Sequence, residues 1–452
     1  MTSRSLSLCV GSVILLFAAA SHAQQIQYQL QQQQLGPVSG GYVTQGTPMV
    51  SPENGLLLND SALLHVGGTV EVGYDSNVFY DQYSPVHATF LRLTPFLELT
   101  NTSRTGAIPS GLFYDVRASL AYREYLSSQA EVQNLRSFSP SLSAGIEHNS
   151  NGTVTLSFSD AFARNQDPPY TRAEAAARTL ITRDNNLAYG QLRWAPGGGR
   201  LQGVLRLTNV VDWFEYEPLK PASSMTNDLM VDASWRWFPK TALFLQVRQG
   251  YVFYFEDTAA NASANEAALV TTGQKSSSFP LRAVLGIRGL ITEKTSISLA
   301  AGYQNAFYAK GTSTYGFLGS TLLAAELVVM PILPAKITFG VHHDFQNSVI
   351  GNFYYDDGAY VALSYATLAR VIGSLWGRYD HKRFYDVPGL AGGERIDDFI
   401  QAGAVLDYYL RSWLYAGVSY SLGLNESNAD GLNLTGTTYT KHQVYGRIGI
   451  TY

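Results

Sequence analysis

From Val66 to the end of the chain at Tyr452, apolar and polar residues alternate in segments of about ten. In one segment Tyr114, Val116 and Leu120 share a face with other apolar residues, and Asp115, Arg117 and Arg123 lie on the opposite face. A period of two places successive side chains on opposite sides of a β-strand, so these segments predict strands with one apolar and one polar face. The same pattern along the chain gives about 18 strands.

The connections between these segments are sorted by length. Tight turns at 149–152, 195–199, 238–241 and 410–413 alternate with long polar links at 165–184, 212–226, 256–279, 381–397 and 424–437. Short turns on one rim and long loops on the other are typical of a transmembrane β-barrel, which closes on itself because hydrocarbon offers its backbone no hydrogen-bond partners. The predicted fold is therefore all-β: one antiparallel transmembrane barrel of about 18 strands, with short periplasmic turns and long extracellular loops.

The first residues predict export. Arg4 precedes an apolar run from Leu6 to Ala20, and Ser21-His22-Ala23 provides small residues for cleavage before Gln24. This pattern is that of a secretory signal peptide over residues 1–23. A Gln-, Gly- and Pro-rich stretch follows at 24–60, which we interpret as a periplasmic extension, a plug or a docking segment, and the barrel fills 61–452. We therefore expect a location in the outer membrane of a Gram-negative bacterium.

Composition excludes several other classes. Charged residues make up 15% of the 452 residues and the net charge is −4, so a basic nucleic-acid-binding surface is not expected. No apolar stretch after the signal peptide is long enough for a membrane-spanning helix. The single cysteine, Cys9, lies within the signal peptide, so disulfides and thiol chemistry are not expected in the exported chain.

Residues suited to catalysis or metal binding are not grouped in the sequence. We find no nucleotide-binding loop, zinc-ligand spacing or nucleophile motif, and predict neither an enzyme nor a bound cofactor or metal. His342 and His343 are adjacent, so on a strand they point to opposite faces and do not share an ion. The acid pairs Glu256-Asp257, Asp356-Asp357 and Asp397-Asp398 are placed in or beside outer loops, where they are either Ca²⁺ ligands or solvated charges.

If the polar face of each strand points inward, the interior is rich in basic residues. The predicted lumen-lining bases are Arg92, Arg117, Arg123, Arg193, Arg206, Arg236, Arg248, Arg282, Arg288, Lys336, Arg378 and Arg447. The inward acids are Glu71, Glu98, Asp115, Glu147, Asp232, Asp344 and Asp407, with Asp75, Glu326 and Asp380 of uncertain phase. This balance predicts a mildly basic lumen that favours anionic or neutral solutes; the alternative is a set of ion pairs that stiffens the wall.

Aromatic residues form two predicted groups. Those at strand ends, such as Tyr74, Trp194, Trp235 and Trp413, fit the aromatic girdles of a membrane barrel. Others fall on the inward face, where they could stack on sugar rings: Tyr189, Phe244, Trp376, Tyr415 and Tyr445.

The first predicted hairpin carries a recognisable pattern. Residues 67–80 read Gly-Gly-Thr-Val-Glu-Val-Gly-Tyr-Asp-Ser-Asn-Val-Phe-Tyr, and Thr94-Pro95-Phe96 lies in the next strand. Over about 35 residues this resembles the outer-membrane barrel family found with bacterial exopolysaccharide and capsule secretion systems. The final strand, which ends on Tyr452, is similar to the C-terminal assembly signature recognised by the β-barrel assembly machinery.

The resemblance implies an outer-membrane conduit for polysaccharide export. Its expected partners are the polysaccharide, the outer-membrane lipid and a separate periplasmic polysaccharide-export protein, and no nucleic acid. Two alternatives remain at this stage. One is a general or anion-preferring porin for small solutes, and the other is a structural or surface-interaction barrel whose long loops bind a partner.

Overall fold

The structure, a computed structural model, describes residues 54–59, 62–102, 109, 111–150, 152–167, 181–255, 276–309, 320–332, 334–348, 352–367, 370–385, 394–429 and 438–452. The predicted signal peptide and most of the predicted 24–60 extension lie outside these residues. The last part of that extension forms a short strand, β1 (Leu56–Asn59), which pairs with β2 through Leu56 and Leu64.

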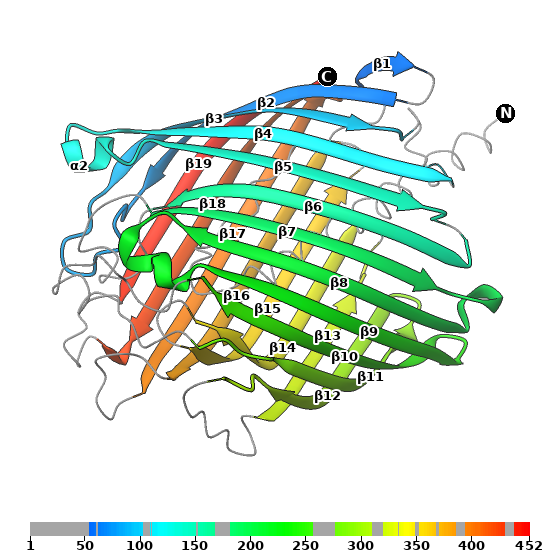
Figure 1. Ribbon diagram of the computed structural model, residues 1–452. Coiled ribbons are helices and arrows are strands. Elements are labelled where there is room, and N and C mark those ends of the chain that lie inside the picture. Colours follow the sequence, from blue (N-terminus) through cyan, green and yellow to red (C-terminus); the bar gives the residue numbers. More distant parts are fainter. Residues whose placement is uncertain are drawn as a thin grey trace.

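Eighteen antiparallel strands, β2 to β19, close into one barrel (Figure 1). Each strand pairs with its neighbours in sequence, and the last strand pairs with β2, for example through Arg447 and Glu71. The strands are β2 (Ala62–Asp75), β3 (Ala88–Thr100), β4 (Leu112–Leu126), β5 (Ser137–His148), β6 (Val154–Asp167), β7 (Ile181–Trp194), β8 (Leu201–Phe214), β9 (Ser224–Phe238), β10 (Thr241–Tyr254), β11 (Leu281–Thr292), β12 (Thr295–Asn305), β13 (Thr321–Val329), β14 (Ala335–Asn347), β15 (Phe353–Thr367), β16 (Val371–Tyr385), β17 (Arg395–Arg411), β18 (Leu414–Ser427) and β19 (Tyr439–Thr451).

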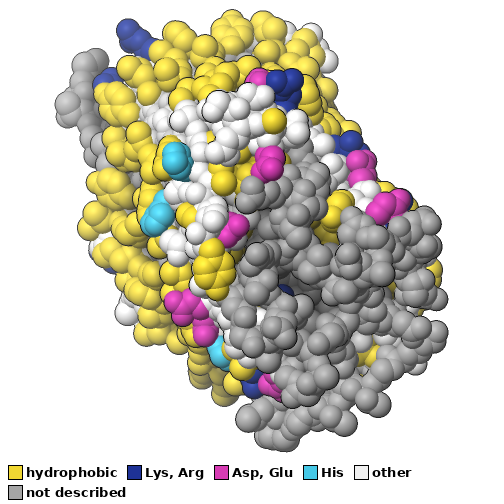
Figure 2. Space-filling view, turned by 90° about the vertical axis from the view of Figure 1, so that its left-hand side faces the viewer, with side chains coloured by type: hydrophobic (Ala, Val, Ile, Leu, Met, Phe, Trp, Pro, Cys, Tyr) yellow, Lys and Arg dark blue, Asp and Glu magenta, His cyan; other side chains and the backbone are white. Residues whose placement is uncertain are grey.

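The alternation in sequence becomes an alternation in exposure. On β2, Val70, Val72 and Tyr74 are exposed to the surroundings of the barrel, whereas Glu71 and Asp75 are buried on the inner side. The same apolar-out pattern recurs on the other strands and gives a continuous hydrophobic flank (Figure 2). Apolar side chains facing outward all round a closed barrel are what a bilayer requires, so the protein is an outer-membrane β-barrel.

The two ends of the barrel differ. Short links, such as the turn between β9 and β10, lie at the end where β2 begins and β19 finishes; there the backbones of Val66 and Tyr452 exchange hydrogen bonds of 2.8 and 2.9 Å. Longer connections at the opposite end carry the short helices α2 (Ala130–Gln133) and η2 (Glu217–Ala222) (Figure 1). A third short helix, η1 (Gly197–Gly199), lies in a turn. Among the described residues, no helix is long and apolar enough to span a membrane.

The predicted fold class is therefore confirmed, including the strand number. Asp356-Asp357 and Asp397-Asp398, expected in or beside outer loops, lie near the loop ends of β15 and β17. Glu256-Asp257 lies outside the described residues.

Glycines on the inner wall accommodate aromatic rings from neighbouring strands. A Cβ atom at Gly73 would lie 2.5 Å from the ring of Phe90 and 2.6 Å from Tyr445, closer than real Cβ contacts allow. Gly286 and Gly449 are covered in the same way by the rings of Phe244 and Tyr415. Large rings opposite glycines fill the inner surface without pushing the strands apart, and this packing fixes the register of the strands.

We expect Gly73→Val to destabilise the barrel by about 1–3 kcal/mol, because the new side chain overlaps Phe90 and Tyr445. Gly446→Val is the matched control, since Gly446 faces outward on β19 and has nothing within 4 Å of its Cβ position. The measurement is urea unfolding of the full barrel in detergent, followed by tryptophan fluorescence. Equal stability of the two variants would contradict this packing.

Candidate functional site on the inner wall

Ion pairs join neighbouring strands along the inside of the barrel. Beside the seam between β19 and β2, Arg447 Nε and Nη2 donate across β18 to Asp407 at 2.9 and 2.6 Å, and the Arg447 side chain is 1% exposed. Arg92 pairs with Glu71, and Arg117 Nη1 donates to Glu98 at 2.9 Å. Carboxylates compensate the arginines in this region, so their net effect is to hold strands together.

The inner faces of β7 to β11 differ, because their arginines outnumber their acids. We call this surface the arginine wall, and its members are Arg183, Arg193, Arg206, Arg236, Arg248, Arg282 and Arg288. The inward carboxylates of the same strands are Asp212, Asp228 and Asp232. The described part of this wall is therefore positively charged.

Strand register arranges three of these arginines in a row. Arg206 lies opposite Met230, Met230 opposite Arg248, and Arg248 opposite Arg282. A second row nearer the short turns places Arg236 opposite Ala242, which lies opposite Arg288. Like charges directly across a strand pair are unfavourable, so the direct neighbours Arg248 and Arg282 raise the local positive potential at a cost in stability.

The partners of the arginine wall leave part of its charge uncompensated. Arg206 donates to the amide oxygen of Gln191 at 2.9 Å, and its guanidinium lies 5.1 Å from the ring centre of Tyr189. Arg193 donates at 2.9 Å to the Ser150 carbonyl and at 2.9 Å to the Thr155 hydroxyl. In both contacts the acceptor is neutral.

Four arginines of this wall have acidic partners, of which two are Arg183, paired with Asp212, and Arg282, paired with Asp344. Arg248 pairs with Asp228, and Arg288 lies 3.4 Å from Asp232. The Arg288 side chain is still 44% exposed, so a solute inside the barrel can reach it.

The opposite wall, on β14 to β19 and β2, is nearly balanced in charge. Its inward carboxylates are Asp344, Asp356, Asp380, Asp397, Asp407, Glu71 and Asp75. They alternate with the basic residues Lys336, Arg378, Lys382, Arg395, Lys441 and Arg447. The interior is therefore asymmetric, with one positive wall facing one near-neutral wall.

The structure places all twelve predicted lumen-lining bases on the inner strand faces; that they line a solute path stays a prediction. Asp75, Glu326 and Asp380, whose phase was uncertain, also face inward. The sequence interpretation missed four inward bases, Arg183, Lys382, Arg395 and Lys441. All four lie near the loop ends of strands, beyond or at the limits of the predicted segments.

The five inward aromatics are packed onto the wall. Tyr415 and Tyr445 are 2% and 6% exposed, and Tyr445 lies 5.2 Å from the Arg92 guanidinium. Phe244 is covered by Arg288 at 5.0 Å, and Trp376 lies over Gly403. Tyr189 has the Arg206 guanidinium over its ring. Arginine thus occupies ring faces that were expected to be available for stacking.

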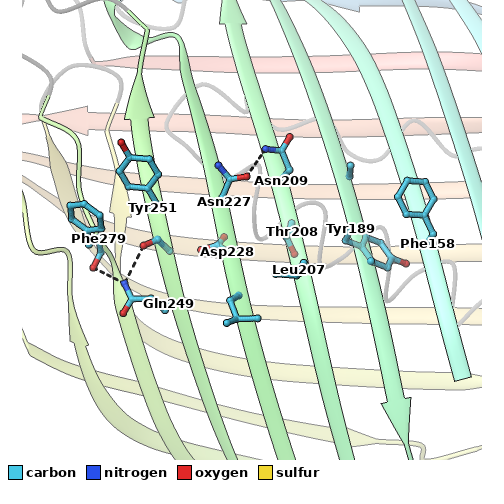
Figure 3. A pocket seen from close by; sticks show the side chains of 14 residues that line it. Phe158, Tyr189, Leu207, Thr208, Asn209, Asn227, Asp228, Gln249, Tyr251 and Phe279 are labelled. Carbon is cyan, nitrogen blue, oxygen red and sulfur yellow. Dashed lines mark hydrogen bonds between the residues drawn. The ribbon is translucent and has the colours of Figure 1, made fainter. Parts of the chain in front are cut away.

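A hollow of about 600 Å³ opens on the outer side of β6 to β10, with Phe279 at its edge (Figure 3). Its rim includes Phe158, Leu207 and Tyr251, and Asn209 donates to Asn227 at 2.8 Å within it. The amides satisfy each other at a wall that faces lipid, where an unpaired polar group would be costly. This hollow is separate from the arginine wall, which lies on the inner side of the same strands.

Comparison with known proteins finds solved structures at low similarity. No family model matches the chain, and no curated protein matches it. Solved structures that share its barrel include the siderophore receptor PirA from Pseudomonas aeruginosa, with 8% identity, a TM-score of 0.41, and coverage of 86% of this chain and 80% of that one. The ferric enterobactin receptor PfeA from the same organism has 9% identity and a TM-score of 0.41, with 86% and 81% covered.

The siderophore receptor PiuA from Acinetobacter baumannii has 9% identity and a TM-score of 0.43, with 86% of this chain and 82% of that one covered. All three proteins are named as receptors for siderophores or for ferric enterobactin. At this level of identity the likeness concerns the fold.

These findings correct the functional prediction. The expected polysaccharide-export conduit is withdrawn, because the solved structures found are siderophore receptors. The expected partners, a polysaccharide and a periplasmic export protein, are withdrawn with it. The porin and surface-interaction alternatives also lack support from the comparisons.

We expect Asp407→Ala to lower the free energy of unfolding by about 3–5 kcal/mol, because it leaves the buried Arg447 without a counter-charge. Glu217→Ala, which removes the exposed loop partner of Lys220, should cause a much smaller change. Urea unfolding in detergent micelles measures both variants. If the two losses are similar, the Arg447–Asp407 pair contributes no more than a surface pair.

Proposed function

We propose that this outer-membrane barrel takes up a small organic anion by binding it on the arginine wall. The observation that supports this most strongly is the excess of arginines over carboxylates on the inner faces of β7 to β11. Seven arginines against three carboxylates give this wall a net positive charge, which attracts anions and raises their local concentration.

Arginine is suited to binding such a ligand. Its planar guanidinium presents several donors in a fixed fork that matches carboxylate and phosphate groups. Arg206 and Arg248 lie in one pleat row, with the uncharged Met230 between them. Two guanidinium groups that lie two strands apart on the same face can each bind one acidic group of the same ligand. We therefore propose a di- or tricarboxylate, or a phosphorylated small molecule.

The two rows of arginines favour transport in which the ligand binds at successive sites over free diffusion. Arg206 and Arg248 lie nearer the loop end of the barrel, and Arg236 and Arg288 form a second row nearer the short turns. A ligand released by the first row meets a second set of donors before it reaches the periplasmic end. Uptake should therefore saturate with ligand concentration.

We expect the combined substitutions Arg206→Gln, Arg248→Gln and Arg288→Gln to weaken citrate or phosphate binding at least about tenfold, because three charge-assisted contacts are lost. Arg164→Gln is the control: Arg164 faces outward and pairs with Asp184 and Glu215. Calorimetry on the full barrel measures binding, and uptake into proteoliposomes measures transport. Uptake that rises linearly with concentration and is equal in both variants would refute the proposal.

Charge reversal tests whether these arginines line the path. Replacing Arg206, Arg248 and Arg288 by Glu should shift the ion selectivity of the barrel towards cations, because the potential of the wall changes sign. Reversal potentials in planar bilayers under a salt gradient give the selectivity. Unchanged selectivity would mean that ions do not pass along this wall.

A further inference from the structure

Three metal-ligating side chains meet on the near-neutral wall of the barrel. His342 on β14, Asp356 on β15 and Asp380 on β16 all point inward from neighbouring strands. Their donor atoms lie within 4.8 Å of one another, and among the described residues they form the one group of three or more His, Cys, Asp or Glu with this property. The sequence did not reveal it, because the three residues come from different strands.

The register makes this convergence possible. His342 lies directly opposite Gly358, and Gly358 directly opposite Asp380. A Cβ atom on Gly358 would lie 2.6 Å from His342 Nε2 and 2.6 Å from an Asp380 carboxylate oxygen. Because glycine has no side chain, a space that we call the cradle is left over Gly358. There the His342 imidazole and the Asp380 carboxylate approach each other across β15.

Asp356 supplies the third donor from the same strand as the glycine. It is 2% exposed, and its Oδ2 lies 3.4 Å from His342 Nε2. Its other oxygen, Oδ1, is buried and has no hydrogen-bond partner among the described residues. A buried carboxylate oxygen without a donor is costly, and a bound cation would satisfy it.

Arg378 bridges the two carboxylates and orients them. Its Nε donates to Asp380 Oδ1 at 2.7 Å, and its Nη2 donates to Asp356 Oδ2 at 3.3 Å. Arg378 and Lys382 both act electrostatically on these carboxylates, so two bases match the charge of Asp356 and Asp380. Lys382, opposite Asp356, places its ammonium 4.5 Å from the ring centre of Phe399.

We propose that His342, Asp356 and Asp380 bind one divalent transition-metal ion, with Zn²⁺ as the representative probe. One imidazole nitrogen and two carboxylate oxygens form a donor set that zinc accepts, and three protein ligands leave a position open for water or a solute. Ligands of one zinc ion lie roughly 3–4 Å apart, so the histidine–Asp356 pair already fits and Asp380 needs a small rotation. The bound ion would tie β14, β15 and β16 together.

The first test uses two adjacent histidines. We expect the full barrel in detergent, without an affinity tag, to bind one Zn²⁺ per chain in calorimetric titration with zinc chloride, and His342→Ala to weaken binding at least about tenfold. His343→Ala is the matched control, because His343 faces outward and pairs with Asp357. Zinc should raise the Tm of the parent and of His343→Ala but not of His342→Ala.

A second variant tests the cradle itself. Gly358→Ala keeps all three ligands but fills the space between His342 and Asp380, so it should also weaken zinc binding at least about tenfold. Resistance to unfolding in SDS without heating shows whether each variant still forms the barrel. No zinc binding by the parent, or equal binding by the parent, His342→Ala and Gly358→Ala, would overturn the proposal.

Discussion

The backbone's need for hydrogen-bond partners in hydrocarbon determines the rest of this molecule. Each strand between β2 and β19 is paired on both sides, and the β2–β19 seam leaves the barrel no open edge. Closure gives every strand one face towards lipid and one towards the interior. Because the lipid face must be apolar, charged side chains of the membrane-spanning strands collect inside, and the chemistry of the protein follows from their arrangement there.

The strands and their faces were predictable from the sequence, but their register was not. Alternation alone put Arg206, Arg248 and Arg288 on the inner face, since a period of two needs no knowledge of the neighbouring strand. That Arg248 lies beside Arg282, or that Gly358 lies between His342 and Asp380, depends on pairing. Pairing is fixed by turn geometry and by rings packed over glycines such as Gly73, which involve residues far apart in sequence.

The pattern that suggested polysaccharide export has a structural explanation. Gly67 and Gly73 accommodate the rings of Phe96 and Phe90, Asp75 pairs with Lys441 across the seam, and Asn77 donates to the Thr440 carbonyl at 3.1 Å. Val78 and Phe79 are buried in a core cluster under the loop after β2. These residues close the barrel between its first and last strands. Other barrels that close between their first and last strands can need the same residues. The pattern is therefore explained by closure of the barrel and does not indicate which solute is transported.

The charges inside the barrel go beyond what stability requires. Arg248 lies opposite Arg282, and Asp344 lies opposite Asp356, two like-charged pairs that each disfavour folding. Arg282 on β11 reaches across β12 and β13 and donates to Asp344 on β14 at 3.0 Å, which offsets one charge of each pair. Arg248 also pairs with Asp228 on its own wall, and Asp356 lies 3.3 Å from Arg378. The Arg282–Asp344 pair thus connects the two walls. Replacing the like charges with apolar residues would give a simpler and more stable wall, so their presence favours a binding role for both walls.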